Sequence, residues 1–373
     1  MKKIINILFN DFTNDNRVFK ESQSLIKAGY NIELIATRFD KKNPVDEEIK
    51  GIKVHRVSVG NFNFLPLNLF LFWFKVFMLK KREAIFHCND LYALPPAFFI
   101  KKIINRNVKI VYDCHEHETE AGIYIGKPIL KWLSKVIEKL MIKSVDNVIT
   151  VSESIAEDYV KSYAIEKPQL VLNCPNYKEY KDLDIFRKNF KLDKEKIIFL
   201  YQGEYLKGRG VDNLIEIFKV LEKENKNLVL ILLVYGEGIE SLKEKIKGIQ
   251  NIFWHDKVSK DIYMDYVSSC DWGIYLMENI CKNHDYALPN KLFDYIMAGL
   301  PVVVSNLKEM SKFVDENHIG YTVDSTNPDN IVKLLKGFTN TSKEKFNENL
   351  KVVPKKYCWE EQEKVLIKIY NSL

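Results

Sequence analysis

Cysteines are few and scattered in this sequence, and long apolar runs are missing. The six cysteines form no Cys-x-x-Cys pair and no cluster with histidine at zinc-ligand spacing, so free thiols in a reducing compartment are expected. Residues 62–79 come nearest to a membrane span of about 18 apolar residues, but two asparagines, a proline and a lysine interrupt them. Residues 1–10 lack the apolar core and cleavage site of a secretory signal. The sequence therefore predicts a cytoplasmic protein.

Glycine is absent from residues 10–16, the loop that follows the first expected strand. That absence excludes the Gly-x-Gly-x-x-Gly turn of an NAD-binding Rossmann domain. The chain also has no Gly-x4-Gly-Lys-Ser/Thr sequence, which argues against a phosphate-loop NTPase. Positive charge is in only modest excess: the formal net charge of +6 suits anionic ligands or an anionic membrane surface and does not indicate nucleic acid.

Strand and helix patterns alternate along nearly the whole chain, which predicts an α/β fold built on parallel sheets. The charged stretch at 177–195 separates two similar halves, and we expect one Rossmann-like domain at 1–180 and a second at 190–355. A last helix is expected within 356–373. The expected strands are 3–9, 31–36, 52–59, 84–88, 109–113, 147–151, 171–172, 196–201, 228–235, 252–255, 272–276, 302–305 and 320–323.

The most informative segment is residues 287–304, where a short helix at 291–298 ends at a glycine before a buried strand. Asn290 is a suitable N-cap, so the unpaired N–H groups and positive dipole end of the helix lie beside Lys291 and favour a phosphate. Asp294 follows one turn later, where its carboxylate can accept hydrogen bonds from sugar hydroxyls. The segment predicts a nucleotide-sugar site, and an ordinary helix–glycine–strand joint is the alternative.

This segment resembles the donor-site motif of the retaining family-4 glycosyltransferases, which have the GT-B fold. One departure is Tyr286, which stands where the family has the first glutamate of a Glu-x7-Glu pair. The resemblance implies two Rossmann-like domains that face each other across a cleft, with the terminal helix 356–373 packing back on the first domain. The matching positions are Pro289, Lys291, Asp294 (in place of glutamate), Tyr295, Ala298, Gly299, Pro301 and Val302.

A glycine-rich turn opens the second half at residues 201–212. It resembles the family's Gly-x5-Lys-Gly motif, with Arg209 in place of the lysine, and arginine can grip a diphosphate with two parallel hydrogen bonds. The family often has an arginine directly after the first glycine, where this chain has Glu204. A flexible, solvated turn is the alternative. The residues that the resemblance implies in donor binding here are Gly203, Lys207, Gly208, Arg209 and Gly236.

Residues 111–118 end a strand with Asp113, His115 and Glu116, similar to the family's Tyr-Asp-x-His-Glu signature. The resemblance implies that His115 hydrogen-bonds the transferred sugar, and that Asp113 and Glu116 orient it or contact the acceptor. Because alternate residues of a strand face the same way, His115 and His117 could instead chelate a metal. Ordinary polar surface residues are a third interpretation.

The first loop carries Asp15 and Arg17, which match an Asp-x-Arg-Val variant of this family branch. The resemblance places the loop at the cleft, where Arg17 would meet an acceptor phosphate, while Asp15 could equally cap the next helix. His87 and Asp90 end another strand and are similar to a His-x-x-Asp of the family. Buried hydrogen bonding is the alternative use of these two residues.

The helix expected at 127–143 has a lysine at every fourth residue beside an apolar side. Such a helix can lie on an anionic lipid surface. An ordinary amphipathic helix with its charged face in solvent has the same pattern. The apolar region 62–79 and the basic residues 80–82 favour the membrane, although a core or an acceptor-lipid groove would use the same side chains.

Taken together, the resemblance implies a metal-independent, retaining glycosyltransferase without a cofactor, peripheral on the inner face of the plasma membrane. A UDP- or GDP-sugar would bind the second domain, and a lipid-linked oligosaccharide acceptor the first, as in the synthesis of capsule or O-antigen. Arg209, Lys291 and the helix N-terminus at Asn290 would stabilise the departing nucleoside diphosphate. A nucleotide-sugar epimerase of the same fold and an inactive sugar-nucleotide-binding partner protein are the alternatives.

Overall fold

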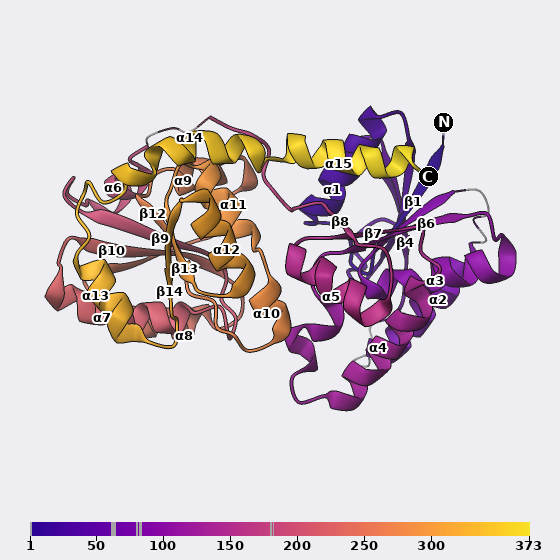
Figure 1. The fold of residues 1–373 in the computed structure, drawn as a ribbon, viewed down its shortest axis with the longest axis horizontal. Helices are drawn as coiled ribbons and strands as arrows, with labels where there is room; N and C mark the ends of the chain where they lie inside the picture. The colour runs from indigo at the N-terminus through magenta and orange to yellow at the C-terminus, as the bar shows by residue number, and fades with distance from the viewer. Residues whose placement is uncertain (1, 61–64, 80, 82–83, 180, 182) are drawn as a thin grey trace. The chain divides into compact units, whose positions relative to one another are not determined.

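The computed structural model describes residues 2–60, 65–79, 81, 84–179, 181 and 183–373 (Figure 1). The chain divides into two units: the first unit comprises Met1–Asn173 and Gln362–Leu373, and the second unit comprises Cys174–Glu361. Each unit contains its own sheet of mainly parallel strands, which confirms the expected α/β fold. Part of the region expected to meet lipid, residues 62–64, 80 and 82, lies outside the described residues.

The sheet of the first unit has the strand order β3-β4-β2-β1-β5-β6-β7-β8. Strands β2, β4 and β3 lie on one side of β1, and the chain then returns to place β5 on the other side, so the order reverses between β1 and β5. The antiparallel edge strand β3 was not expected, because its residues are mostly charged. The strands are β1 (Lys3–Ile7), β2 (Asn31–Thr37), β3 (Asp46–Ile49), β4 (Ile52–Val57), β5 (Ile85–Asn89), β6 (Lys109–Cys114), β7 (Asn147–Thr150) and β8 (Gln169–Leu170).

Helix α1 (Asn16–Lys27) begins at a capping residue and packs one apolar face into the core of the first unit. Asp15 accepts a hydrogen bond from the backbone N–H of Val18 (3.1 Å), which fixes the first turn. Val18 and Leu25 are fully buried on the inner face. The other helices of the first unit are α2 (Leu65–Met78), α3 (Leu94–Phe99), the π-helical turn η2 (Ile100–Ile104), α4 (Pro128–Ile142) and α5 (Glu153–Tyr163), with short 3-10 turns at η1 (Leu91–Ala93), η3 (Glu118–Glu120) and η4 (Gly122–Tyr124).

The sheet of the second unit has the order β11-β10-β9-β12-β13-β14, and its paired strands are parallel. The order again reverses, this time between β9 and β12. The strands are β9 (Ile197–Glu204), β10 (Leu228–Tyr235), β11 (Ile252–His255), β12 (Trp272–Tyr275), β13 (Val302–Ser305) and β14 (Gly320–Val323). The helices are α6 (Ile185–Phe190), α7 (Val211–Glu224), α8 (Ile239–Ile246), α9 (Lys260–Val267), α10 (Lys282–Tyr286), α11 (Asn290–Met297), α12 (Lys308–Asn317), α13 (Pro328–Lys336), the 3-10 turn η5 (Glu344–Phe346) and α14 (Asn347–Lys356).

The core of the second unit follows from the continuous apolar composition of its central strands. All residues of β10 except the last are buried, as expected for a parallel strand covered on both faces. Helix α7 presents Leu214, Phe218 and Leu221 to the sheet at helical spacing, and each is fully buried. Burial of each such side chain contributes about 2 kcal/mol to stability. The last helix, α15 (Trp359–Asn371), contributes Tyr370 to the core of the first unit.

None of the helices that the structure describes has the length and apolarity needed to cross a bilayer. Apart from β3, the observed strands fall within a few residues of those expected. The weakest prediction was the strand at 171–172, which the structure places at Gln169–Leu170.

Candidate functional site

Two loops of the second unit meet at the carboxyl edge of its sheet, where the strand order reverses. One loop follows β9 and the other follows β12, and the backbone N–H of Glu278 donates to the carbonyl of Gly208 (2.9 Å). Gly210 has φ +79°, and a Cβ there would lie 1.9 Å from the carbonyl oxygen of Leu276, so only glycine fits. In open α/β sheets this switch point is where ligands bind.

Arg209 and Lys291 converge on one tyrosine at this edge. The Nη1 of Arg209 donates to the hydroxyl of Tyr275 (2.9 Å), and the Nζ of Lys291 lies 4.8 Å from the centroid of the same ring. Gly203 leaves the space that Lys291 fills, because a Cβ at Gly203 would lie 2.7 Å from its Cε and Nζ atoms. Two cations are thus held close together by neutral groups.

Lys291 is part of the first turn of α11, which begins one residue earlier than expected. Pro289 occupies the N-cap position and Asn290 is an exposed first helical residue, which corrects the expectation that Asn290 is the cap. Burial and the charge of Arg209 lower the pKa of Lys291 to about 8. An anion at this helix end would relieve the repulsion between the two cations and accept from the first N–H groups.

Asp294 lies one turn after Lys291 on α11 and is held by neutral donors. Its Oδ2 accepts from the hydroxyl of Tyr263 (2.8 Å), on α9, and from the Nε2 of Gln202 (3.3 Å), on β9. Burial and this carboxylate raise the pKa of Tyr263 well above its usual value, so the tyrosine remains a donor. The carboxylate therefore has a fixed orientation.

The remaining predicted residues of the second unit are placed around this group. Gly208 is buried against Ile280 and His284, which brings helix α10 to the glycine-rich loop. Lys207 is exposed, and Gly236 lies beside the side chain of Glu204. The Nζ atoms of two lysines flank the unexpected Tyr286: Lys282 at 5.2 Å and Lys308 at 5.0 Å from its ring centroid.

In the first unit, Arg17 occupies a different kind of site from the one expected. Its guanidinium is 4% exposed and binds Asp113 through two nitrogens (Nη2–Oδ1 2.7 Å, Nε–Oδ2 3.1 Å). A second ion pair joins Arg17 to Glu21 (3.0 Å), and Nη1 donates to the carbonyl of Val171 (2.9 Å). The prediction that Arg17 meets an acceptor phosphate is therefore wrong, because buried carboxylates of its own unit bind this cation.

The other residues predicted for the site of the first unit either have structural roles or are exposed to solvent. Asp15 is the N-cap of α1, the structural alternative considered for it. Asp113 is fully buried, so it orients Arg17 and His115 and is not presented to an acceptor. Glu116 is exposed in the loop after β6.

His115 lies between two carboxylates after β6. Its Nε2 lies 3.2 Å from Asp113 and its Nδ1 lies 3.4 Å from Asp90, which also accepts from the backbone N–H of His115 (3.0 Å). Asp90 adopts φ +63°, a conformation that few non-glycine residues take, and this turn aims its carboxylate at His115. Burial alone would lower the pKa of His115, but Asp90 and Asp113 raise it to about 10. His115 is therefore a cationic hydrogen-bond donor at neutral pH.

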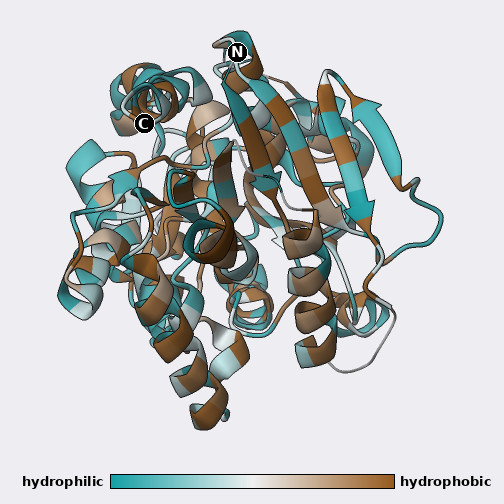
Figure 2. Cartoon of the chain, turned by 90° about the vertical axis from the view of Figure 1, so that its right-hand side faces the viewer, coloured by the Kyte–Doolittle hydropathy of each residue, from teal (hydrophilic) through white to brown (hydrophobic). Residues whose placement is uncertain are grey.

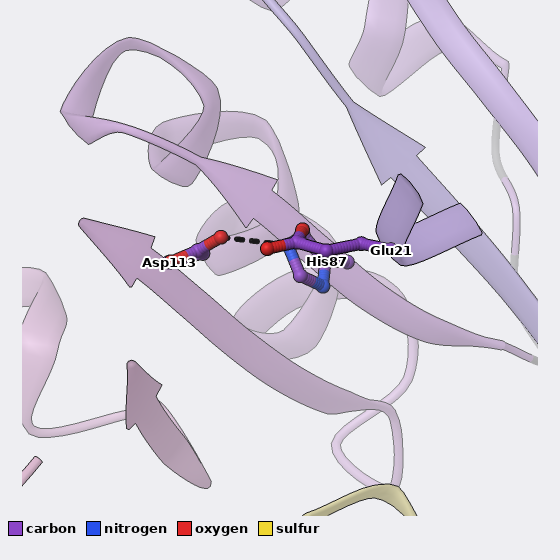
Figure 3. Close-up of side chains that lie close together, drawn as sticks. All are labelled: Glu21, His87 and Asp113. Carbon is purple, nitrogen blue, oxygen red and sulfur yellow. Dashed lines mark ion pairs between the residues drawn. The ribbon is translucent and has the colours of Figure 1, made fainter. Parts of the chain in front are cut away.

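Glu21, His87 and Asp113 form a buried cluster whose ligand-type atoms lie within 4.8 Å of one another (Figure 3). Arg17 forms ion pairs with both carboxylates of this cluster, so their negative charges are compensated by a side chain and need no metal cation. The hydroxyl of Tyr370, on α15, hydrogen-bonds the Nδ1 of His87. We assign the cluster a structural role, which is the alternative considered for His87.

The metal alternative at His115 and His117 finds no support in the placement of these side chains. His117 is buried and its Nε2 bonds Asp158 (2.7 Å), whereas His115 faces Asp90 and Asp113. Sequence reasoning also missed Tyr263 and Tyr275, which no motif marked. A tyrosine at the carboxyl end of an apolar strand was the one signal that could have indicated Tyr275.

Both halves of the chain match models of glycosyltransferase families. Residues 16–174 match the family described as Glycosyltransferase Family 4, and residues 182–352 match the family described as Glycosyl transferases group 1. An uncharacterized glycosyltransferase of Methanocaldococcus jannaschii is 22% identical over 92% of this chain and 90% of its own.

Two further relatives add biological context. An uncharacterized 41.2 kDa protein in the cps region of Klebsiella pneumoniae is 24% identical over 73% of this chain and 74% of its own. The chitobiosyldiphosphodolichol beta-mannosyltransferase of Kluyveromyces lactis is 24% identical over 84% of this chain and 78% of its own.

Solved structures share the fold at low sequence identity. Sucrose-phosphate synthase from Thermosynechococcus elongatus superposes with a TM-score of 0.78 at 15% identity, covering 100% of this chain and 99% of that one. The HepE protein of Anabaena, in complex with UDP-glucose, superposes with a TM-score of 0.73 at 13% identity and covers 100% of both chains.

Proposed function

Because the chain belongs to the family-4-like glycosyltransferases of GT-B fold, we propose that it transfers a sugar, with retention of configuration, from a UDP- or GDP-sugar to a lipid-linked saccharide acceptor. The second unit binds the donor and the first unit binds the acceptor. The Klebsiella cps-region relative and the dolichol-linked mannosyltransferase support a role in surface polysaccharide synthesis such as that of capsule or O-antigen.

The observation that carries this proposal is the convergence of Arg209 and Lys291 beside the N-terminus of α11. In the proposed reaction the bond between the anomeric carbon and the diphosphate oxygen breaks, and the two cations stabilise the charge on the departing nucleoside diphosphate. The acceptor hydroxyl attacks the same face of the oxocarbenium-like sugar. Its proton passes to the leaving diphosphate, so the step needs neither a metal ion nor a separate general base.

Two further residues are assigned roles in this proposal. Asp294 binds the ribose hydroxyls, because its carboxylate is oriented by Tyr263 and Gln202 and lies one helical turn from Lys291. His115 donates to a saccharide hydroxyl from Nδ1, which turns from Asp90 (3.4 Å) toward the sugar while Nε2 keeps its hydrogen bond to Asp113 (3.2 Å).

The test measures nucleoside diphosphate release from UDP- and GDP-sugars with and without membrane-extracted lipid-linked acceptors. We expect release that depends on the acceptor and that falls at least about 100-fold in Arg209→Ala and Lys291→Ala. Lys247→Ala, an exposed lysine of the same unit, is the matched control. Product formation that survives both site substitutions undiminished would overturn the proposal, and release without acceptor or conversion of the donor sugar itself would favour an epimerase.

We further propose that the first unit docks on the cytoplasmic face of the plasma membrane through α2 and α4. Helix α4 has its apolar residues outward: Ile129, Trp132 and Leu140 are 75%, 62% and 68% exposed. Its inward face carries Glu138, which is fully buried and accepts hydrogen bonds from the hydroxyls of three tyrosines. Those donors are Tyr112 (2.8 Å), Tyr159 (2.8 Å) and Tyr163.

Helix α2 extends the apolar surface, since Phe70 and Phe74 are more than half exposed. Figure 2 shows hydrophobic helices beside the sheet of the first unit. The occupant we commit to is an anionic bilayer. The described residues of α2 include no acidic side chain, and the single acid of α4 is buried, so neither helix turns a carboxylate of its own toward lipid headgroups.

Insertion of apolar side chains is the main contribution to this docking. Lys131 and Lys135, two members of the lysine stripe, each pair with Glu120 at 2.5 Å, so their charges are already compensated. Co-sedimentation with phosphatidylglycerol-containing vesicles tests the surface. The variant Ile129→Ser/Trp132→Ser/Leu140→Ser is expected to lose binding, whereas Val220→Ser/Val352→Ser, which removes exposed apolar residues of the second unit, retains it. Equal binding of both variants would refute the surface, and binding of the parent only to another protein would identify a protein partner instead.

A further inference from the structure

Tyr275 ends strand β12 with its side chain buried beneath the two cations of the second unit. Its hydroxyl accepts from the Nη1 of Arg209 (2.9 Å) and donates to the Sδ of Met277 (3.3 Å). The face of its ring lies 4.8 Å from the Nζ of Lys291. One side chain therefore contacts Arg209 through its polar end and Lys291 through its ring.

We propose that Tyr275 is a positioning residue that holds Arg209 and Lys291 together at the spacing required by one diphosphate, an inference that rests on the proposed function. Two cations repel each other when no anion lies between them. A carboxylate in this place would hold them together but would also repel the diphosphate. A tyrosine attracts both cations without a net charge, through its hydroxyl oxygen and the negative face of its ring.

The surroundings of Tyr275 keep this arrangement fixed. Strand pairing joins β12 to both β9 and β13, so the backbone of Tyr275 is part of the central sheet. Gly203 at the end of β9 leaves room for Lys291 over the ring, because a Cβ there would lie 2.7 Å from Nζ. Burial and, after it, the nearby charge of Arg209 lower the pKa of Lys291.

The chain offers a matched control in Tyr201, which lies on β9 with its ring centroid 5.9 Å from that of Tyr275. Tyr201 is as deeply buried as Tyr275. Its hydroxyl has no hydrogen-bond partner among the described residues. Loss of a buried phenolic hydroxyl in general is therefore measured by Tyr201→Phe, and loss of the link to Arg209 by Tyr275→Phe.

The first measurement uses ligand-free protein and follows the titration of Lys291 by NMR with isotope-labelled lysine, its signal being assigned by its absence from Lys291→Gln. Tyr275→Phe keeps the ring but removes the hydroxyl that binds Arg209, so the pKa of Lys291 is expected to rise above about 8 by the share that Arg209 contributes, while the larger share from burial stays. Tyr201→Phe is expected to leave the titration unchanged. An unchanged titration in Tyr275→Phe would overturn the inference, whichever nucleotide the protein binds.

The second measurement is calorimetric titration with UDP and with GDP. We expect Tyr275→Phe to weaken binding of the preferred nucleotide about tenfold, as for loss of one hydrogen bond to a charged group, and Tyr201→Phe to bind like the parent. Because Tyr275 acts through Arg209, Tyr275→Phe should add little further loss to Arg209→Ala but its full loss to Lys291→Ala. Equal further loss in both backgrounds would contradict a positioning role. Failure of the parent to bind either nucleotide would refute the proposed function, and the NMR titration would then still test the role of Tyr275.

Discussion

The sheets of the two units both have a point where the strand order reverses, and an arginine lies near each point. The two arginines differ in the charge of the groups that bind them. In the first unit, Arg17 is bound by Asp113 and Glu21, and these carboxylates raise its pKa above the ordinary value in spite of burial. In the second unit, Arg209 donates to a neutral hydroxyl, and its charge helps to lower the pKa of Lys291 to about 8.

The direction of these shifts separates a structural cation from a binding cation. A raised pKa means that the folded protein favours the charged form of Arg17, so the charge stabilises the fold. A lowered pKa means that the folded protein disfavours the charged form of Lys291, and an anionic ligand would reverse that cost. The same residue type near the same point of two related sheets therefore serves stability in one unit and ligand binding in the other.

The largest expected effect is on stability, from removal of Arg17. Arg17→Ala leaves Asp113 and Glu21 buried without their cation, which is expected to cost about 3–5 kcal/mol of unfolding free energy. Arg209→Ala should change stability far less, because it removes a hydrogen bond to the neutral hydroxyl of Tyr275. Urea unfolding of both variants, followed by circular dichroism, measures the difference.

A double substitution sharpens this comparison. Burial raises the pKa of Glu21 to about 7 even beside Arg17, so the charge that Arg17→Ala strands is chiefly that of Asp113, and adding Asp113→Asn should recover part of the loss. If Arg17→Ala and Arg209→Ala destabilised the protein equally, the division between a structural and a binding arginine would be untenable.

A second contrast concerns a glycine of each unit. Gly210 and Gly29 both have positive φ (+79° and +90°), but only Gly210 is crowded, with Leu276 O at 1.9 Å from an added Cβ and nothing within 4 Å at Gly29. Both alanine variants carry the conformational cost of an L-residue in this region. Gly210→Ala is expected to lose about 2 kcal/mol more than Gly29→Ala, from the steric overlap, and to lose UDP binding as well. Equal unfolding midpoints for Gly210→Ala and Gly29→Ala would show that the close contact between the loops after β9 and β12 does not contribute to the free energy of unfolding.

Features that depend on residues close together in the sequence could be predicted, whereas contacts between residues far apart in the sequence could not. Apolar runs such as residues 228–235 define strands locally, and Arg209 and Lys291 are marked by glycines and turn residues next to them. The sequence shows the charge of Arg17 but not its partner, because Asp113 is 96 positions away and is brought close by the pairing of strands. Tyr275 was missed for the same reason, since its contacts with Arg209 and Lys291 come from the loop after β9 and from α11.

The pH dependence of stability tests whether Lys291, in contrast to Arg17, is a cation whose charge destabilises the fold. The folded pKa of Lys291 is about 8 and its ordinary value is 10.5, so folded protein binds fewer protons than unfolded protein between these values, and stability rises with pH across this window. Lys291→Met, which removes the charge, should therefore raise the midpoint of thermal unfolding at pH 7, by about 2–4 °C for each kcal/mol of repulsion relieved.

The same substitution should abolish the pH dependence of UDP binding. In the parent, affinity is expected to be constant below about pH 8 and to fall above it, as Lys291 loses its proton. Lys291→Met should bind weakly at every pH, and Lys247→Ala should behave as the parent. A parent affinity that stays level from pH 7 to about 10 would mean that the charge of Lys291 does not contact the nucleotide.

The smallest expected effect concerns the carboxylates of the two units. Asp113 is paired with Arg17, whereas Asp294 accepts from the neutral donors Tyr263 and Gln202, which orient it for a ribose hydroxyl in the proposed site. Tyr263→Phe removes one of these donors and should weaken UDP binding about three- to tenfold, as for one hydrogen bond. The loss should be smaller for 2′-deoxy-UDP, which lacks a hydroxyl for Asp294 to accept from, and Tyr266→Phe on the same helix is the control. An equal loss for both nucleotides would mean that Tyr263 supports the fold of α9 and does not orient Asp294 toward the ribose.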